Sequence, residues 1–495
     1  MKTPSPEEHL AEPGEVRRRP VGALTTERLL GTIQDLVDFA PRATGTPGGK
    51  LAADYVAERF SRAGIADVRV LEEPSYLWKA ERASLLVDDE AIACSPIQHC
   101  GVTWEGQTGD LINARLSGKV VDIGAGPVPA DLRGMIVLFD LVFEVRLKSM
   151  NLLAEYRYDP RRVQKDRKVR DSRNPFQTSM LRVLRAAEKA GAVGVVGVLR
   201  DYPESLAYRN ESFPEEPMGL PGVWVTLETG RALRARLQAD STATLDMHVT
   251  QERVLSQSVI GILPGRTSAT VMIQSHHDSV TPGAVEDASG TAEVIALAEH
   301  FAAMDTDGRT REKTLMFVTF DTHFTGYQAH RRFAEEYLLA TQLEFDVMLN
   351  ATIEHVGLRA ERGQDGQFRA LPHSEPRGIF ENLSLRWKWR LARLIRKNDL
   401  DGTSLLFGTA LEFTEDGIPT DAAYTMSLGI PTISLISGPL YLYDDEDTID
   451  KIDVDQLSPV ANFFADIVEA ADSASPNWIG LIPRPLRRLL PRWRW

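Results

Sequence analysis

One short stretch of the sequence spaces imidazole and carboxylate groups in a way that suits metal binding. The apolar strand ATVMIQS is followed by His276 and Asp278, and Glu286 comes shortly before a predicted helix. An imidazole at a strand end, a carboxylate two residues on to hold the ring, and an acidic group at a helix start form half of a zinc or hard-metal site. Glu286 and Asp287 could instead cap the helix. Capping does not explain why a histidine and Asp278 precede the same turn.

This stretch resembles the signature of a known enzyme family. SHHDSVTPGAVEDASGTAEVIALAEHF is similar to that of the co-catalytic zinc exopeptidases, of aminopeptidase, glutamate carboxypeptidase and transferrin receptor type, in which a His-x-Asp-Ser strand end precedes a Gly-Ala-x-Asp-Asn-x-Ser-Gly turn. PRATGTPGGKLAADYVAERF and SQSVIGILPG resemble the family's N-terminal segment and the strand before its first ligand. The segment 78–254 is similar to the protease-associated domain that is inserted in some members. The resemblance covers nearly the whole chain.

The resemblance implies roles for four residues. His276 matches the first metal ligand, and Asp278 matches the carboxylate that supports it. Glu286 falls where the family has its metal-bridging Asp, and Glu354 matches the Asp ligand of an Asp-x-x-Gly strand end. Each Glu is longer than Asp by one C–C bond, roughly 1.5 Å. A metal here is therefore expected to be displaced or bound in a different mode.

Two other positions depart from the family pattern. His323 and Phe324 stand where the family has a Glu-Glu pair, of which the first Glu is the general base and the second is a metal ligand. Tyr443 stands where the family has its last histidine ligand. Because both losses fall on the non-bridging ligands of one metal, we expect a single divalent metal, with zinc as the expected ion. Its expected ligands are His276, Glu286 and Glu354. His323 is expected to be the general base, since unperturbed imidazole titrates at about 6.5.

The neighbours of these positions have weaker interpretations. Asp321 could orient the His323 ring, and Tyr443 could be a weak ligand, an oxyanion donor or an aromatic lid. His277 and His355 lie beside matched positions, so the alternation of a strand should turn both away from the metal.

The resemblance and the retained residues predict a diverged, metal-dependent amide hydrolase, similar to aminopeptidases and carboxypeptidases, that acts on a peptide or a small acylated amine. The metal would activate a water molecule, whose proton His323 would accept, while Asp278 would fix the tautomer of His276. The main alternative is a catalytically inactive binding or scaffold protein on the same fold, which the loss of several catalytic groups favours. A cyclase or transferase with one metal is a third, narrower possibility.

The elements that must hold these residues predict an α/β fold with a mixed, mostly parallel sheet that helices cover on both faces. After residue 255, apolar strands alternate with amphipathic helices, and the candidate residues come where strands stop. Residues 78–254 instead show short β runs, one helix, and a basic loop between residues 156 and 173 that is either a solvated insertion or a site for an acidic partner. The expected parts are a flexible segment 1–24, an exopeptidase-like domain 25–77 and 255–475, a protease-associated-like insert 78–254, and a basic tail 476–495.

Composition narrows the partners and the compartment. The 495 residues carry a formal net charge of −14, which disfavours nucleic acid as a partner. Two cysteines, no apolar leader and no apolar run of about 18 residues predict a cytoplasmic protein without a transmembrane segment. The tail interleaves Arg with Trp and Leu, so it could contact an anionic membrane surface or a partner, although its three prolines favour a docked or floppy tail. The insert could shape the pocket, limit substrate size or form a homodimer contact.

Overall fold

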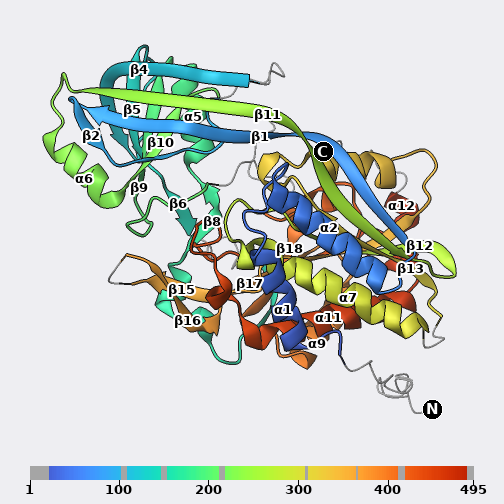
Figure 1. The fold of residues 1–495 in the computed structure, drawn as a ribbon. Coiled ribbons are helices and arrows are strands. Elements are labelled where there is room, and N and C mark those ends of the chain that lie inside the picture. The colour runs from blue at the N-terminus through green and yellow to red at the C-terminus, as the bar shows by residue number, and fades with distance from the viewer. Residues whose placement is uncertain are drawn as a thin grey trace.

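The structure is a computed structural model, and it describes residues 22–101, 109–145, 153–210, 218–306, 310–363, 366–410 and 418–487. In this part of the chain most strands join one mixed sheet of fifteen strands that runs through two units (Figure 1). Its order along the main path is β3-β10-β9-β5-β4-β11-β13-β12-β14-β19-β17-β18-β7, and β1 and β2 lie off this path. The predicted fold class, an α/β fold around a mixed sheet, is confirmed.

The lower unit in Figure 1 contains the strands that carry the candidate residues. Its central neighbours β13, β12, β14 and β19 are mutually parallel, so their carboxyl ends meet at one edge of the sheet. The strands of this unit are β12 Thr267–His276, β13 Lys313–Phe320, β14 Asp346–Ile353, β17 Arg377–Glu381, β18 Thr403–Phe407 and β19 Thr432–Ser437. A separate hairpin pairs β15 Leu358–Arg362 with β16 Phe368–Ser374.

Helices cover both faces of this unit, as predicted. Along β13, Leu315 and Phe317 belong to one apolar core, whereas Met316 and Val318 belong to another, because alternate side chains of a strand point to opposite faces. The first core contains the apolar sides of α1 Thr26–Val37, α2 Pro47–Arg62, α7 Ser289–Thr306, α9 Leu385–Lys397 and α11 Val454–Asp472. The second contains residues of α8 Gln328–Phe333 and, near its edge, Tyr424 of α10 Ala423–Ser427.

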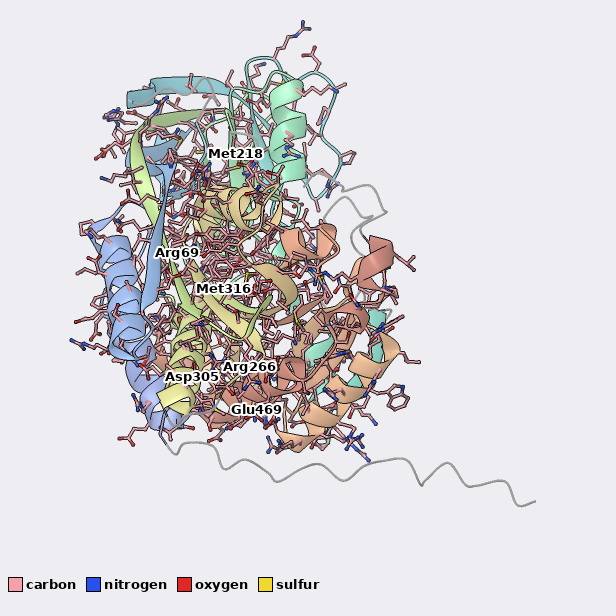
Figure 2. All side chains as sticks on the ribbon, turned by 90° about the vertical axis from the view of Figure 1, so that its right-hand side faces the viewer. Arg69, Met218, Arg266, Asp305, Met316 and Glu469 are labelled. Carbon is pink, nitrogen blue, oxygen red and sulfur yellow. The ribbon has the colours of Figure 1, made fainter. Side chains whose placement is uncertain are left out.

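Two very long strands connect the units. β1 Asp67–Val87 and β11 Thr242–Leu263 pair antiparallel from Asp67↔Ile262 to Val87↔Ala243, and Figure 1 shows this pair running from one unit into the other. In Figure 2, Met218 lies in the upper part of the molecule and Met316 near its middle. The predicted boundaries of the insert, 78 and 254, therefore fall inside continuous strands, and the division into domains stays a prediction.

The upper unit is built from the rest of the segment between β1 and β11. Its strands are β2 Glu90–Ile92, β3 Ser95–Pro96, β4 Gly109–Gly124, β5 Met135–Asp140, β9 Gly194–Leu199 and β10 Gly222–Thr226. Its main helices are α5 Met180–Lys189 and α6 Leu227–Arg236. Between the units, β6 Phe143–Val145 pairs with β8 Arg173–Thr178.

One part of this segment joins the lower unit directly. β7 Ala154–Tyr158 pairs with β18 at the edge of the main sheet, and the short helix α4 Arg167–Arg170 follows. The expectation of an irregular basic loop from residue 156 to residue 173 is therefore wrong, because main-chain pairing with β18 orders its beginning. Among the described residues, no helix is long and apolar enough to cross a membrane.

Candidate metal centre

The candidate centre forms where the parallel strands of the lower unit end. β12 ends at His276, and β14 ends one residue before Glu354. His323 begins the short 3-10 helix η3 His323–Thr325, just after β13. Glu286 lies in η2 Ala284–Ala288, the turn that leads into α7. Parallel neighbours deliver their carboxyl ends to one edge, which explains why residues far apart in the sequence meet there.

Three imidazoles surround the carboxylate of Glu286. The Nε2 atoms of His276 and His323 lie 3.2 and 3.4 Å from Oε1, and the Nε2 atom of His355 lies 2.6 Å from Oε2. The side chains of His276 and Glu286 are fully buried, and those of His323 and His355 are nearly so. We refer to these four residues as the imidazole cluster.

The second nitrogen of each ring is held by an oxygen atom. Nδ1 of His276 lies 3.1 Å from the carbonyl oxygen of Asp278, Nδ1 of His323 lies 2.9 Å from Oδ1 of Asp421, and Nδ1 of His355 lies 2.7 Å from the carbonyl oxygen of Ser437. An oxygen acceptor at Nδ1 fixes the proton there, so a neutral ring presents the lone pair of Nε2. In their neutral forms, all three rings therefore direct the Nε2 lone pair to the side of Glu286. This arrangement is typical of metal-binding histidines.

Two overlapping groups of ligand-type atoms lie close enough to hold an ion. One consists of His276, Asp287 and His355, and the other of His276, His323 and Asp421. His276 is common to both. The donor set is mixed imidazole and carboxylate, which suits zinc and other divalent transition metals.

The charges of the imidazole cluster depend on one another. Burial opposes ionisation of Glu286, but the charge of His355 and the other imidazoles outweighs it and holds the pKa of Glu286 well below its ordinary value. Burial also opposes protonation of His355, but the Glu286 carboxylate raises the pKa of His355 to about 10. Against the same burial, Asp421 raises the pKa of His323 to about 9. Without a metal, the centre is thus a carboxylate among protonated imidazoles.

The Glu354 side chain is directed at neighbouring hydroxyl groups and not at Glu286, in contrast to the predicted role as a ligand. Its Oε1 atom accepts hydrogen bonds from the hydroxyls of Thr420 and Ser434 at 2.5 and 3.2 Å. Burial first, and then the charge of Asp421, raise the pKa of Glu354 to about 8, so this carboxyl is mainly protonated near neutral pH. His355, its neighbour, makes the contact with Glu286 instead.

The expectation that His355 points away from the site is wrong, and the backbone explains why. β14 ends at Ile353, and His355 has φ of 60°, in the left-handed region, so the two-residue alternation of the strand no longer applies. His277 does turn away, and its Nδ1 atom lies 3.1 Å from the hydroxyl of Thr319.

Two further expectations need correction or refinement. Asp321 does not orient His323, because its carboxylate accepts from Thr44 and from the amide of Gln257. The residue that orients His323 is Asp421, 98 positions further along the chain, and no motif in the sequence marks it. Asp278 holds His276 mainly through its carbonyl oxygen, while its carboxylate lies 3.4 Å from the same nitrogen.

Several groups hold the turn that carries Glu286. Asp447 accepts from the amides of Val285 and Glu286 at 3.0 and 2.9 Å. Asp287 accepts from the amide of Gly290 at 3.0 Å and from Ser275 at 2.6 Å, so of the two acidic residues considered as helix caps it is Asp287 that has this role. These hydrogen bonds fix the backbone of the turn and therefore the position of the Glu286 Cα atom.

Arg42 fastens the strand end to the N-terminal segment. Its guanidinium is fully buried and donates to the carbonyl oxygens of His277, Leu36, Pro282 and Gly283 at 2.8–3.1 Å. Three of these charge-assisted hydrogen bonds fix the loop between His276 and Glu286, and the fourth joins it to the end of α1. Arg42 lies in the segment PRATGTPGG but was not among the residues predicted from the sequence.

Aromatic side chains border the imidazole cluster. Phe324 and Tyr443 meet edge to face, with ring centroids 5.9 Å apart, and both are buried. Phe176, from β8, stacks on His355 at 5.8 Å and meets Tyr443 at 6.3 Å. We refer to Phe176, Phe324 and Tyr443 as the aromatic cluster.

Comparisons with known proteins agree with this geometry. The family model described as "Peptidase family M28" matches residues 258–352, which contain His276, Glu286 and His323. A comparison with curated protein sequences gives no significant match. The family model therefore matches the part of the chain that contains the central strands and the turns of the candidate centre.

The fold is similar to those of solved aminopeptidases. The zinc aminopeptidase BSAP from Bacillus subtilis superimposes with a TM-score of 0.61 at 20% identity, over 94% of this chain and 99% of that one. A peptidase M28 precursor from Shewanella amazonensis SB2B gives 0.62 at 18% identity, over 92% and 98%. An aminopeptidase from Aneurinibacillus sp. strain AM-1 gives 0.57 at 20% identity, over 93% and 97%. The match of the family model over residues 258–352 and the shared fold confirm the resemblance to the zinc-dependent exopeptidases.

Proposed function

We propose that this metallopeptidase-like hydrolase cleaves an amide bond of a peptide or small acylated amine with one divalent metal, zinc being the expected ion. The observation that carries the proposal is the convergence of three imidazole Nε2 atoms on Glu286, each with its Nδ1 atom held by an oxygen. Structural polar clusters rarely present several lone pairs to one point, whereas metal sites require it.

The residues fit a metal, with one change from the ligand set predicted from the sequence. His276 and Glu286 keep their proposed roles, and His355 replaces Glu354 as the ligand from the end of β14. The reason is that His355 directs Nε2 toward Glu286, while Glu354 is engaged by Thr420 and Ser434. Two imidazoles and a carboxylate are a common set for a catalytic zinc that keeps an open position.

The aromatic cluster supports a single metal. Phe324 and Tyr443 stand at the positions where the resemblance implies ligands of a second ion, and they pack against each other. Phenylalanine offers no lone pair, and a pair of packed rings excludes water and ions from the space between them. One half of a two-metal centre is thus replaced by an apolar contact.

The remaining groups of the centre have roles in moving a proton. When bound, the metal would polarise the substrate carbonyl and activate water. Asp421 holds Nδ1 of His323, so Nε2 is the atom that can accept a proton from the attacking water and return it to the leaving amine. Asp278 holds His276 in the matching tautomer and also accepts from the amide of Phe324 at 3.3 Å.

Burial of the centre favours a small substrate. The four side chains of the imidazole cluster are at most 5% exposed, and Phe176 covers His355. The segment that follows β9 is also tied to the loop of Tyr443, because the amide of Arg209 donates to the Tyr443 carbonyl at 2.6 Å and Tyr202 donates to Asp444 at 2.8 Å. A long polypeptide would have to displace more of these contacts than a dipeptide or a small acylated amine.

The test is metal analysis of the purified chain, stripped with a chelator and then reloaded with zinc. We expect one zinc per chain, retention of this metal in Glu354→Gln, and its loss in His276→Ala and His355→Ala. Hydrolysis of a panel of short aminoacyl and acyl amides should follow the same pattern. Two ions per chain, or none after reloading, would contradict the proposal. Loss of metal in Glu354→Gln with retention in His355→Ala would restore the sequence-based ligand set.

The binding or scaffold alternative has one observation in its favour, the deep burial of the centre beneath aromatic rings. It predicts that the reloaded chain binds zinc but cleaves no member of the amide panel. It also predicts that Phe176→Ala, which uncovers His355, gives no gain of hydrolysis.

A further inference from the structure

One surface of the lower unit, away from the carboxyl ends of the parallel strands, combines exposed tryptophans with arginines that are not in ion pairs with described residues. Its first part is the outer side of α9. Leu385 and Trp389 are 70% and 67% exposed, and the arginines Arg393 and Arg396 continue the same stripe at helical spacing. The opposite side of α9, with Trp387, Leu391 and Ile395, packs into the core. The exposed stripe is therefore held rigidly outward.

The second part is the C-terminal segment, which lies beside the start of α9. Ser384 donates its amide to Ile479 and its hydroxyl to the carbonyl of Trp478, at 2.8 and 2.9 Å, and Leu481 donates its amide to Asn382 at 2.8 Å. Ile479 is fully buried and anchors the segment. We refer to the exposed apolar residues of both parts as the tryptophan face. Its members are Leu385, Trp389, Trp478, Leu481 and Ile482.

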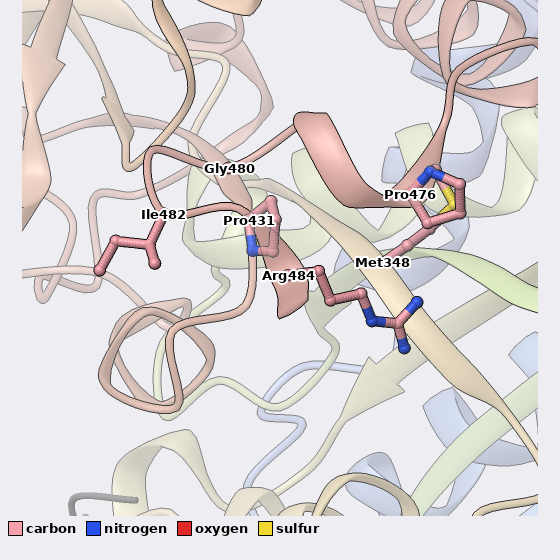
Figure 3. A pocket seen from close by; sticks show the side chains of 6 residues that line it. All are labelled: Met348, Pro431, Pro476, Gly480, Ile482 and Arg484. Carbon is pink, nitrogen blue, oxygen red and sulfur yellow. The ribbon is translucent and has the colours of Figure 1, made fainter. Parts of the chain in front are cut away.

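The anchoring explains why these apolar side chains are presented and not hidden. Gly480 and Ile482 line a small hollow with Met348 and Pro431, and in Figure 3 the side chain of Ile482 points away from Pro431. Trp478, Leu481 and Ile482 are 65%, 45% and 44% exposed. A row of exposed Trp, Leu and Ile on an ordered scaffold is unusual for a surface that only meets water.

The charge of this face is opposite to that of the molecule. Residues 384–398 contain six Lys and Arg, residues 476–495 contain five Arg, and neither segment contains Asp or Glu, although the whole chain carries −14. Arg386, Arg393 and Arg396 make no ion pair with any described residue, whereas Lys397 pairs with Asp466 at 2.8 Å. After burial, the nearby charges of Arg386 and Arg393 are the further causes that lower the pKa of Arg390, so these three guanidinium groups lie close to one another.

We propose that the tryptophan face, with Arg386, Arg393 and Arg396 of α9, docks the protein on the surface of an anionic lipid bilayer. Tryptophan prefers the boundary between headgroups and acyl chains, and clustered arginines are attracted to anionic headgroups. The surface combines Trp, Leu and Ile with Arg. A lipid surface would use both kinds of side chain, whereas recognition of an acidic protein would rest mainly on the arginines. The proposal extends the tail contact considered from the sequence to α9, and it is independent of the chemistry of the metal centre.

Vesicle flotation of the full chain tests the proposal, with phosphatidylcholine vesicles compared with vesicles that contain phosphatidylglycerol. We expect binding to the anionic vesicles only, weakened by salt. Replacing Arg386, Arg393 and Arg396 by Gln should weaken binding about 100-fold, since each arginine near such a surface contributes about 1 kcal/mol. The matched control has the same change of charge at Arg82, Arg133 and Arg167, which lie outside α9 and the C-terminal segment, and should bind as the parent does.

A second pair of measurements separates lipid docking from other uses of the face. Trp389→Ala with Trp478→Ala should weaken binding at least about tenfold without changing the circular dichroism spectrum, because both side chains are exposed. Tryptophan fluorescence of the parent should shift to the blue on anionic vesicles and be quenched by brominated lipid. Failure of the full chain to bind, or equal loss in the control, would overturn the proposal. So would self-association in solution that the tryptophan variant abolishes while vesicle binding is absent, since that result assigns the face to a second copy.

Discussion

The imidazole cluster and the aromatic cluster lie side by side, and one is polar whereas the other is apolar. On one side, three histidines and Glu286 keep their polar atoms directed at a common point. On the other side, Phe324 and Tyr443 close the equivalent space with an apolar edge-to-face contact. His323 and Phe324 are consecutive, so the boundary between the two falls within a single turn of η3. One edge of the sheet thus holds a cluster of ligand-type side chains directly beside an apolar ring contact.

The largest effect is expected from Glu286→Gln, which removes the carboxylate that the Nε2 atoms of all three imidazoles contact. Metal binding should be lost, and the metal-free chain should lose about 3–5 kcal/mol of unfolding free energy, the usual result of leaving a buried charge unpaired. Chemical denaturation in the presence of a chelator measures the second quantity. Glu354→Gln is the matched control and should change both little, because the Glu354 carboxyl is already mainly protonated near neutral pH. Equal effects of the two substitutions would contradict the assignment.

The aromatic cluster should be convertible into a second metal site. Phe324→Glu combined with Tyr443→His restores the residue types of the family pattern, so the number of zinc ions per chain should rise from one to two. Metal analysis after reloading measures the change. The volume-matched control Phe324→Leu with Tyr443→Phe should stay at one ion. A double variant that still binds one ion would indicate that the backbone, and not only these side chains, has diverged.

Stability of the metal-free chain should depend on pH with a defined sign. The folded-state pKa values of His355 and His323 are raised to about 10 and about 9, above the ordinary value of about 6.5. Their contribution is therefore fully present below about pH 6.5 and is lost as pH rises through 9 to 10, by at most about 1.4 kcal/mol per pH unit for each proton. Denaturation midpoints between pH 6 and pH 10 measure the decline. His355→Gln should flatten the upper part of the profile, and an unchanged slope would contradict the assignment.

The smallest effect is expected from Phe176→Ala. Loss of the ring contacts with His355 and Tyr443 should cost roughly 1–2 kcal/mol of unfolding free energy, because Phe176 is only partly buried. Metal stoichiometry should stay the same, and cleavage of bulkier amides should increase relative to small ones. Thermal unfolding and a comparison of kcat/KM across the amide panel measure these changes. A decrease for bulky amides would mean that Phe176 binds substrate and does not obstruct it.

Local patterns in the sequence predicted much of the fold and part of the candidate site. The segment from β12 through α7 was recognisable because His276, Asp278 and Glu286 lie within eleven residues, and the alternating strands and helices of the lower unit indicated an α/β sheet covered on both faces. Asp421 and Arg42 could not be identified in this way. Each is defined by partners that are distant in the chain, His323 for Asp421 and the carbonyl oxygens of residues 277–283 for Arg42. No local pattern encodes such contacts.

His355 illustrates a different limit. Alternation along a strand is a sound rule only while the backbone remains extended, and the positive φ of His355 ends its validity one residue after Glu354. The match of Glu354 to an Asp-x-x-Gly strand end predicted a ligand, whereas its carboxyl accepts hydrogen bonds from the hydroxyls of Thr420 and Ser434. The pattern of residue types along the chain does not contain these partners, because they lie 66 and 80 positions further on.

The antiparallel ladder of β1 and β11 has a mechanical consequence. A domain inserted through two flexible linkers can rotate about them, but here twenty-one residues of β1 continue from one unit into the other with their hydrogen-bonded partners. β11 also pairs with β13, the strand that leads to His323. β1 and β11 therefore form one two-stranded ribbon. The upper unit lies at one end of this ribbon, and the other end borders the candidate metal centre. Access to the centre must come from flexing of this ribbon or from local rearrangement near Phe176, because the connection contains no free hinge.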